Sequence, residues 1–118
     1  MKKVYYLSSC STCSRIMKEL NIGEEFEQQD IKNEKITTEQ LDEMKRMSGS
    51  YESLFSRTAM KYKSMGLKNM DLQEEDYRNY ILEEYTFLKR PVFIVNDQIF
   101  VGNSKKNIAA LASYLSNN

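Results

Sequence analysis

Apolar positions follow three successive patterns along this chain. Residues 3–7 form a short β-rich run that ends in Ser8-Ser9, and the next apolar positions recur at the spacing of one helical face. Those positions are Cys13, Ile16, Met17 and Leu20. We expect Gly23 to end this helix and residues 25–31 to form a second, less hydrophobic strand. The opening pattern therefore predicts a strand, a helix and a second strand.

The middle of the chain has the pattern of helices alone. Thr37 with Gln40 predicts a capping box, and residues 48–50 break the helix that follows it. A further helix is expected over about residues 58–65, with Gly66 as its C-terminal cap. Another helix starts at Asp71 or just after it. Its predicted apolar face consists of Tyr77, Tyr80, Ile81 and Leu88, with Tyr85 nearby.

The last part of the chain returns to strands. Residues 92–95 and 99–101 flank Asn96-Asp97-Gln98, which predicts a β-hairpin. Asn103 or Ser104 then caps a final helix. The whole order is β-α-β, a helical middle and β-β-α. It predicts an α/β, thioredoxin-like fold with a mixed four-stranded sheet, and a single domain over residues 1–118 whose helical insertion covers about 37–88.

Composition narrows the chemistry that this fold could carry. Seventeen basic residues balance seventeen acidic ones, so nothing attracts the whole chain to nucleic acid or to an anionic membrane. No apolar run approaches the roughly 20 residues that span a bilayer, and we expect a cytoplasmic protein. The chain has no histidine, which excludes Cys–His dyads and histidine metal sites. Two cysteines fall short of a four-thiolate zinc site, unless a second copy of the chain completes it.

The strongest chemical signal is Cys10-Ser11-Thr12-Cys13, between the predicted strand end and helix start. Unpaired N–H groups at a helix N-terminus stabilise a thiolate, so we expect Cys10 to be the reactive sulfur. Cys13 lies one turn further on, on the apolar helix face, and is expected to be the buried, resolving partner. The alternative is two unrelated buried cysteines, because free cysteine is among the most buried residue types.

Two further features surround the second half of the predicted sheet. Pro91 is the only proline, and the local sequence favours an ordinary loop proline at the start of a strand, since cis X–Pro bonds are uncommon. Positive charges are available to bind an oxyanion near Cys10, although solvated surface charges are the alternative. These candidates are Arg15, Arg57, Lys89 and Arg90.

Three segments of the chain, in order, resemble the ArsC/Spx family. They are residues 6–15 around the cysteines, residues 50–67, and residues 88–92 followed by Val101-Gly102. The resemblance implies a thioredoxin-like fold with a helical insertion and a nucleophile at Cys10. It implies that Arg90 binds oxyanions beside a cis-proline, Pro91, and that Arg57 is a second arginine near the active site.

The sequence also differs from the arsenate reductases of that family. They often carry a proline where this chain has Ser8 or Ser9, and a further arginine where this chain has residues 99–103. Many of them lack a second cysteine at the Cys13 position and rely on glutathione and glutaredoxin. Cys13 permits an internal disulfide, which an external reductant such as thioredoxin or glutaredoxin would reduce.

Two classes of function follow from the resemblance. The first is a thiol-dependent oxidoreductase resembling arsenate reductase, in which Cys10 attacks arsenate or a disulfide and Cys13 or glutathione resolves the product. The second is an Spx-like redox-sensing regulator that binds RNA polymerase, with Gly49 at the partner interface. For either class we expect no bound cofactor or metal, no direct contact with nucleic acid or membrane, and a monomer.

Overall fold

A mixed four-stranded sheet organises one of the two units into which the chain divides. The computed structural model describes residues 1–117. One unit combines residues 1–34 with the chain from residue 90 onward, and the other is residues 35–89. The first unit contains β1 (Lys2–Tyr6), α1 (Ser11–Glu19), β2 (Glu27–Asp30), β3 (Val92–Val95), β4 (Gln98–Val101) and α5 (Lys105–Ser116).

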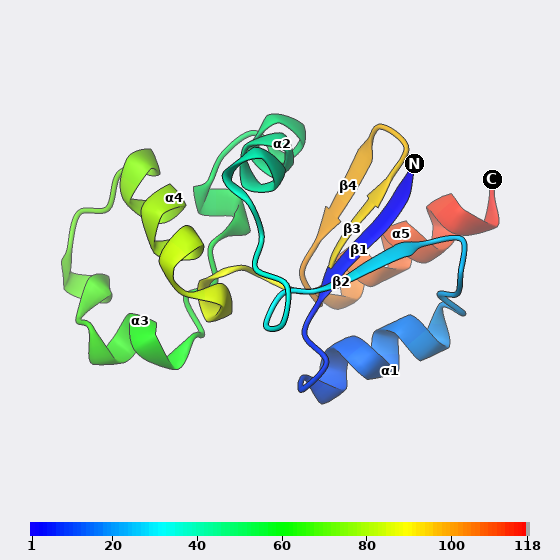
Figure 1. Cartoon of the computed structure of the whole chain (residues 1–118), viewed down its shortest axis with the longest axis horizontal. Coiled ribbons are helices and arrows are strands. Elements are labelled where there is room, and N and C mark those ends of the chain that lie inside the picture. The colour runs from blue at the N-terminus through cyan, green and yellow to red at the C-terminus, as the bar shows by residue number, and fades with distance from the viewer. Residues whose placement is uncertain (118) are drawn as a thin grey trace. The chain divides into compact units, whose positions relative to one another are not determined.

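The strand order in this sheet is β2-β1-β3-β4 (Figure 1). The β1 strand pairs parallel with β2 and antiparallel with β3, and β3 pairs antiparallel with β4. This confirms the predicted α/β fold with its mixed sheet, its βαβ opening and its C-terminal hairpin. The hairpin turn is two residues long and not three as predicted, because Gln98 already belongs to β4. Asn96, the first residue of the turn, takes a positive φ of 57°.

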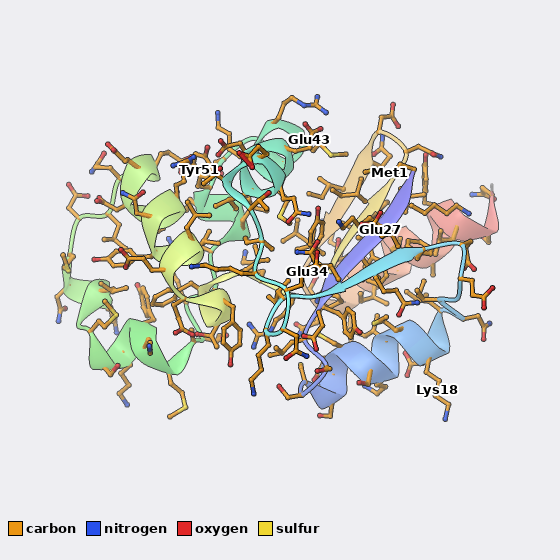
Figure 2. The ribbon with its side chains drawn as sticks, viewed as in Figure 1. Met1, Lys18, Glu27, Glu34, Glu43 and Tyr51 are labelled. Atoms are coloured by element: carbon orange, nitrogen blue, oxygen red, sulfur yellow. The ribbon has the colours of Figure 1, made fainter. Side chains whose placement is uncertain are left out.

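Helices α1 and α5 pack on the same face of the sheet (Figure 1). Val4 in β1 and Phe93 in β3 contribute to a buried cluster with Ile16 of α1 and Leu111 of α5. Each of these side chains is at most 1% exposed, and burial of a side chain of this size contributes about 1.5–3 kcal/mol. Lys18, on the opposite face of α1, points away from the sheet (Figure 2). The amphipathic pattern of α1 therefore fixes which side of the helix meets the sheet.

The end of α1 differs from the prediction. Gly23 does not terminate the helix, because Asn21 takes the left-handed conformation instead, with φ 54°. The Ile22 N–H donates to the Met17 carbonyl oxygen at 2.9 Å, and the Asn21 N–H donates to Lys18 at 3.1 Å. These two bonds form a Schellman motif. Asparagine is one of the few residues other than glycine that visits this conformation routinely.

The second unit is helical. Its elements are α2 (Thr38–Ser48), η1 (Glu52–Leu54), α3 (Met60–Ser64), η2 (Leu67–Asn69), α4 (Glu74–Glu83) and η3 (Tyr85–Phe87). The predicted capping box of Thr37 and Gln40 is confirmed. Gly49 and Gly66 follow α2 and α3 with positive φ values of 102° and 68°, so a side chain at either position would be strained.

The predicted apolar face of the last helix in this unit extends too far along the chain. Tyr77 and Ile81 are buried on α4, but the helix ends at Glu83. Glu84 is extended, and its carboxylate accepts a hydrogen bond from the Thr86 hydroxyl at 2.9 Å. Leu88 is buried, but it does not belong to the helix and instead forms an isolated antiparallel bridge with Phe55. The Glu84 carboxylate thus caps η3, and α4 ends before the apolar spacing stops.

Phe55 lies at the centre of the aromatic core of the second unit. Its ring stacks on Phe87 with centroids 4.9 Å apart and meets Tyr77 edge-on at 5.0 Å. Such pairs contribute about 0.5–1.5 kcal/mol beyond the area that they bury. The second unit therefore has a core of its own, separate from the cluster that lies on the sheet.

An ion-pair network links the helices of the second unit. Arg78 on α4 donates from Nε to Oδ1 of Asp42 on α2 at 2.9 Å, and from Nη2 to Oδ2 at 3.2 Å. The Tyr51 hydroxyl donates to the same Asp42 Oδ1 at 2.6 Å. The hydrogen bonds from Arg78 and then from Tyr51 lower the pKa of Asp42 to about 2. The ionised carboxylate is therefore the form that the folded unit favours.

We expect Asp42→Asn to remove pH-dependent stability from the protein. The folded pKa of Asp42 lies below its ordinary value of 3.8, so its contribution is present above that value and is lost as the pH falls toward the folded pKa. Thermal unfolding followed by circular dichroism should show the wild-type midpoint falling more steeply than that of the variant between about pH 5 and pH 2.

Glu43→Gln is the control for that measurement. Glu43 pairs with Arg46 on the same exposed face of α2, and a pair of this kind contributes only a few tenths of a kcal/mol. Parallel pH profiles for wild type and Asp42→Asn would show that the network contributes no stability.

Candidate active site around Cys10 and Cys13

Cys10 lies at the end of the turn that connects β1 to α1. The Cys10 N–H donates to the Leu7 carbonyl oxygen at 3.0 Å, which closes the turn after the strand. Its own carbonyl oxygen accepts from the Ser14 N–H at 3.2 Å, which is the first bond of the helix. Cys10 is therefore the N-cap residue of α1, with extended φ and ψ. This geometry turns its half-buried side chain toward the unpaired N–H groups of the first helical turn.

Cys13 lies behind Cys10 in the first turn of α1. Its side chain is fully buried, at 0% exposure. The two cysteines approach to 3.6 Å, and both are free thiols. The sequence prediction that Cys13 is the buried member and Cys10 the more accessible member of the pair is confirmed.

The surroundings of Cys10 favour its thiolate. Burial raises the pKa of Cys10, but hydrogen bonds from the Cys13 N–H, the Cys13 thiol and the Thr12 N–H lower it, and so does the charge of Arg90. The lowering effects together outweigh burial, so the pKa of Cys10 lies below its ordinary value of 9.0. Because the thiolate is the nucleophilic form, Cys10 is the more reactive sulfur near neutral pH.

The surroundings of Cys13 have the opposite effect. Burial raises the pKa of Cys13 to about 11, and the negative charge on Cys10 adds to that rise. A hydrogen bond from the Leu7 N–H and the charge of Arg90 act against it without compensating. Cys13 therefore keeps its proton more strongly than Cys10 does, and the Cys13 thiol donates a hydrogen bond to the Cys10 sulfur.

Arg90 and Pro91 approach the cysteines from β3. The Arg90–Pro91 peptide bond is cis, so the interpretation of Pro91 as an ordinary loop proline was wrong and the resemblance gave the observed isomer. Pro91 is buried, and its carbonyl oxygen accepts from the Gly102 N–H at 2.9 Å. Val92 pairs with Tyr5, which places Pro91 beside the end of β1. The half-buried Arg90 acts electrostatically on both sulfurs from this position.

The model of the ArsC family matches residues 5–111. The chain belongs to the ArsC family. No curated protein is significantly similar to it in sequence.

Solved structures from the family share the fold. An arsenate reductase from Vibrio cholerae is 17% identical with a TM-score of 0.75, over 93% of this chain and 94% of that one. An ArsC family related protein from Bacteroides fragilis is 22% identical with a TM-score of 0.75, over 93% and 96%. An arsenate reductase related protein from Brucella melitensis is 21% identical with a TM-score of 0.67, over 92% of each chain. At these identities the likeness establishes the thioredoxin-like ArsC fold.

The other arginines expected at an ArsC site have partners of their own. Arg15 is 61% exposed on α1 and donates to Glu19 at 3.2 Å. Arg57 belongs to the second unit, where it donates to Glu52 Oε2 at 2.7 Å and to the Tyr77 hydroxyl at 3.0 Å. Their roles in binding an oxyanion stay predictions. Lys89, the remaining candidate, closes the second unit through a bond from its N–H to the Leu54 carbonyl oxygen at 2.8 Å.

Gly49 was predicted at a partner interface by resemblance to Spx. Its φ of 102° is a left-handed conformation at the end of α2. This backbone requirement accounts for a glycine there by itself. The partner role of Gly49 stays a prediction.

Asp30 is a site residue that the sequence analysis missed. It ends β2, next to the end of β1, and its carboxylate accepts hydrogen bonds from Ser8 and from the Lys32 N–H at 3.2 Å. Asn33 donates to the other oxygen at 2.8 Å. The bond from the Ser8 side chain is the largest cause of the lowered pKa of Asp30. The available signal was an acidic residue at the carboxyl end of the strand that runs parallel to β1.

A metal-binding group and a membrane-spanning helix are both absent from the described residues. Within residues 1–117, no three of the cysteine and acidic side chains gather closely enough to hold a metal ion. No helix in the same range is both long and apolar enough to cross a membrane.

We expect Arg90→Met to raise the pKa of Cys10. The Arg90 charge favours the Cys10 thiolate, so its loss makes the thiolate scarcer near neutral pH and slows alkylation by iodoacetamide. The pKa is read from the alkylation rate against pH, with Arg90→Lys as the control that keeps the charge. A midpoint that stays at the wild-type value in the Met variant would contradict a role for this charge.

We expect Asp30→Ala to destabilise the loop that carries Cys10. The substitution removes the acceptor of the exposed Ser8 and Lys32 donors, which costs about 0.5–1.5 kcal/mol in the free energy of unfolding. Urea denaturation measures this loss. Asn33→Ala is the matched control, because it removes one bond to Asp30 and leaves the Ser8 contact in place. Equal stabilities of the two variants would show that Asp30 does not hold the loop.

Proposed function

We propose that the chain is a thiol-dependent oxidoreductase of the arsenate reductase type, with Cys10 as nucleophile and Cys13 as resolving thiol. The observation that carries this proposal is the 3.6 Å separation of an accessible and a buried thiol, whose surroundings shift their pKa values in opposite directions. The Cys10 sulfur ionises more readily than an ordinary thiol, while Cys13 keeps its proton within reach of it. A pair of unrelated structural cysteines has no need of such an asymmetry.

With arsenate as substrate, the reaction consumes two thiols. The Cys10 thiolate forms a sulfur–arsenic bond and a hydroxyl of arsenate leaves as water. The Cys13 sulfur then attacks the Cys10 sulfur, and the sulfur–arsenic electron pair stays with arsenic, which is reduced from the pentavalent to the trivalent state. The products are arsenite and a Cys10–Cys13 disulfide. Arg90 would neutralise negative oxygens beside the reacting atom.

A protein disulfide is the other candidate substrate for the same pair. Cys10 would attack one sulfur of that disulfide, and Cys13 would release the second substrate thiol by closing the internal disulfide. In either reaction an external dithiol system, thioredoxin or glutaredoxin with glutathione, returns the pair to the reduced state. We place this chemistry in the cytoplasm, as the sequence predicts, because thiols there are kept reduced.

The test is arsenate-dependent NADPH consumption by the purified protein. Thioredoxin with its reductase is supplied in one series, and glutathione with glutaredoxin and glutathione reductase in the other. We expect turnover by wild type that Cys10→Ser abolishes. We expect Cys13→Ser to lose turnover with thioredoxin and to retain it with glutathione, because glutathione can replace Cys13 as the resolving thiol.

The absence of Cys10-dependent turnover in both series would remove arsenate as the substrate. A disulfide substrate is tested in the same cuvette with insulin in place of arsenate, and its reduction would then identify disulfide exchange as the activity. If neither substrate is turned over, the oxidoreductase proposal fails, and binding of purified RNA polymerase becomes the measurement for the regulatory alternative.

A further inference from the structure

The turn that carries Cys10 is held from a neighbouring strand. Residues 7–10 form a β-turn, in which the Cys10 N–H donates to the Leu7 carbonyl oxygen at 3.0 Å. The turn contains no proline, so no pyrrolidine ring fixes its backbone. Its second residue, Ser8, donates to the Asp30 carboxylate both from its N–H, at 3.4 Å, and from its hydroxyl. The position of the turn therefore depends on Asp30.

Asp30 is itself fixed at the end of β2. It pairs with Tyr6 of β1, and the Ile31 N–H donates to the Tyr6 carbonyl oxygen at 2.9 Å. The Asp30 carboxylate also accepts from the Lys32 N–H at 3.2 Å and from Asn33 Nδ2 at 2.8 Å. The bond from Lys32 closes an Asx-turn, which restricts the orientation of the carboxylate. Asp30 is therefore a rigid anchor for the cysteine turn.

The same turn supplies a hydrogen-bond donor to the second sulfur. The Leu7 N–H donates to Cys13, whose side chain is fully buried and therefore shielded from water. A bond from an N–H group stabilises a thiolate more than a thiol. Cys13 also responds to the charge of Cys10 on the same helix and to that of Arg90 before β3. Leu7 is thus the contact through which the turn affects the ionisation of Cys13.

We propose that Asp30, acting through Ser8, is a positioning residue for the resolving step at Cys13. This inference rests on the proposed function, in which Cys13 attacks the Cys10 sulfur after Cys10 has bonded to a substrate. Negative charge develops on the Cys13 sulfur as its proton leaves. The Leu7 N–H already points at that sulfur, and a donor that is fixed before the reaction stabilises the charge without a cost of reorganisation. Asp30 keeps this donor in place because it holds the next residue of the turn.

Dithiobis(nitrobenzoate), supplied in an amount equimolar with the reduced full-length protein, is the probe that separates the two thiols. The Cys10 thiolate attacks its disulfide bond and releases one nitrothiobenzoate, which leaves a mixed disulfide on Cys10. Cys13 then loses its proton to the buffer and attacks the Cys10 sulfur. A second nitrothiobenzoate leaves as the Cys10–Cys13 disulfide forms. Stopped-flow absorbance gives the rate of each phase against pH, and Cys13→Ser, which stops after the first phase, assigns the two.

We expect Ser8→Ala to slow the second phase about 10-fold near neutral pH and to raise the apparent pKa of that phase, because the Leu7 donor is no longer held against Cys13. The first phase should stay at the wild-type rate. The donors to the Cys10 sulfur are Cys13 and Thr12 on α1, so a loosened turn leaves them in place. A purely structural role of the turn would not separate the two phases in this way.

Three further variants control this measurement. Ser8→Thr keeps the hydroxyl and should restore the wild-type second phase. Ser9→Ala makes the same change at the next, exposed residue of the turn and should leave both phases unchanged. Asp30→Ala should slow the second phase as Ser8→Ala does. Circular dichroism shows whether Asp30→Ala folds, and if it does not, Ser8→Ala decides the test, because it alters only one exposed hydroxyl.

The proposal is overturned if Ser8→Ala keeps the second phase of wild type, or if both phases slow equally with unchanged apparent pKa values. The latter result would assign Ser8 and Asp30 to stability alone. Failure of the proposed function gives a different result, because wild type would then release a single nitrothiobenzoate. That outcome removes Cys13 as the resolving thiol, and this inference with it.

Discussion

The packing of α1 on the sheet is the constraint on which the site depends. Ile16 is buried among Val4, Phe93 and their neighbours, and this contact fixes the rotation of the helix about its axis. Cys13, one turn before Ile16 on the same face, is thereby held out of solvent. Cys10, three residues earlier at the N-cap, stays accessible. Two identical side chains thus acquire different environments from the position of one helix, and the difference in their ionisation follows from burial and helix geometry.

The second half of the site is built by strand pairing. The β3 strand runs antiparallel to β1, so the beginning of β3 lies beside the end of β1, where the cysteine loop departs. Arg90 and the cis Pro91 are the residues immediately before β3, and the sheet therefore brings them to the sulfurs from 80 residues further along the chain. The second unit has its own aromatic core and its own ion-pair network, and it carries Arg57 within a separate set of contacts.

Much of the fold could be predicted because its signals are local. Thr37 with Gln40, the position of the hairpin and the left-handed Gly66 each depend on a few neighbouring residues, so the sequence alone reveals them, although the hairpin turn is one residue shorter than predicted. Local signals also misled the prediction where two residues compete. Asn21 took the left-handed position expected of Gly23, and α4 ended at Glu83, before the apolar spacing did.

The parts of the site that escaped sequence analysis depend on contacts between distant residues. Asp30 meets Ser8 only because β2 pairs parallel with β1, and no local pattern records that contact. The isomer of the Arg90–Pro91 bond is decided by the fold around it, so the local sequence favoured the commoner trans form. The resemblance to a family indicated the cis isomer, because members of a family share the tertiary contacts around such a bond, and a short window of sequence does not show those contacts.

The raised pKa of Cys13 has a consequence for the timing of events at the site. Part of that rise comes from the negative charge on Cys10. Once Cys10 has bonded to any partner, its sulfur is neutral and this repulsion disappears, so the proton on Cys13 becomes easier to remove. The Cys13 sulfur therefore ionises more readily after Cys10 has reacted than before, although its burial still raises its pKa. The two thiols therefore react in order, Cys10 first and Cys13 second, because the loss of the negative charge on Cys10 favours ionisation of Cys13.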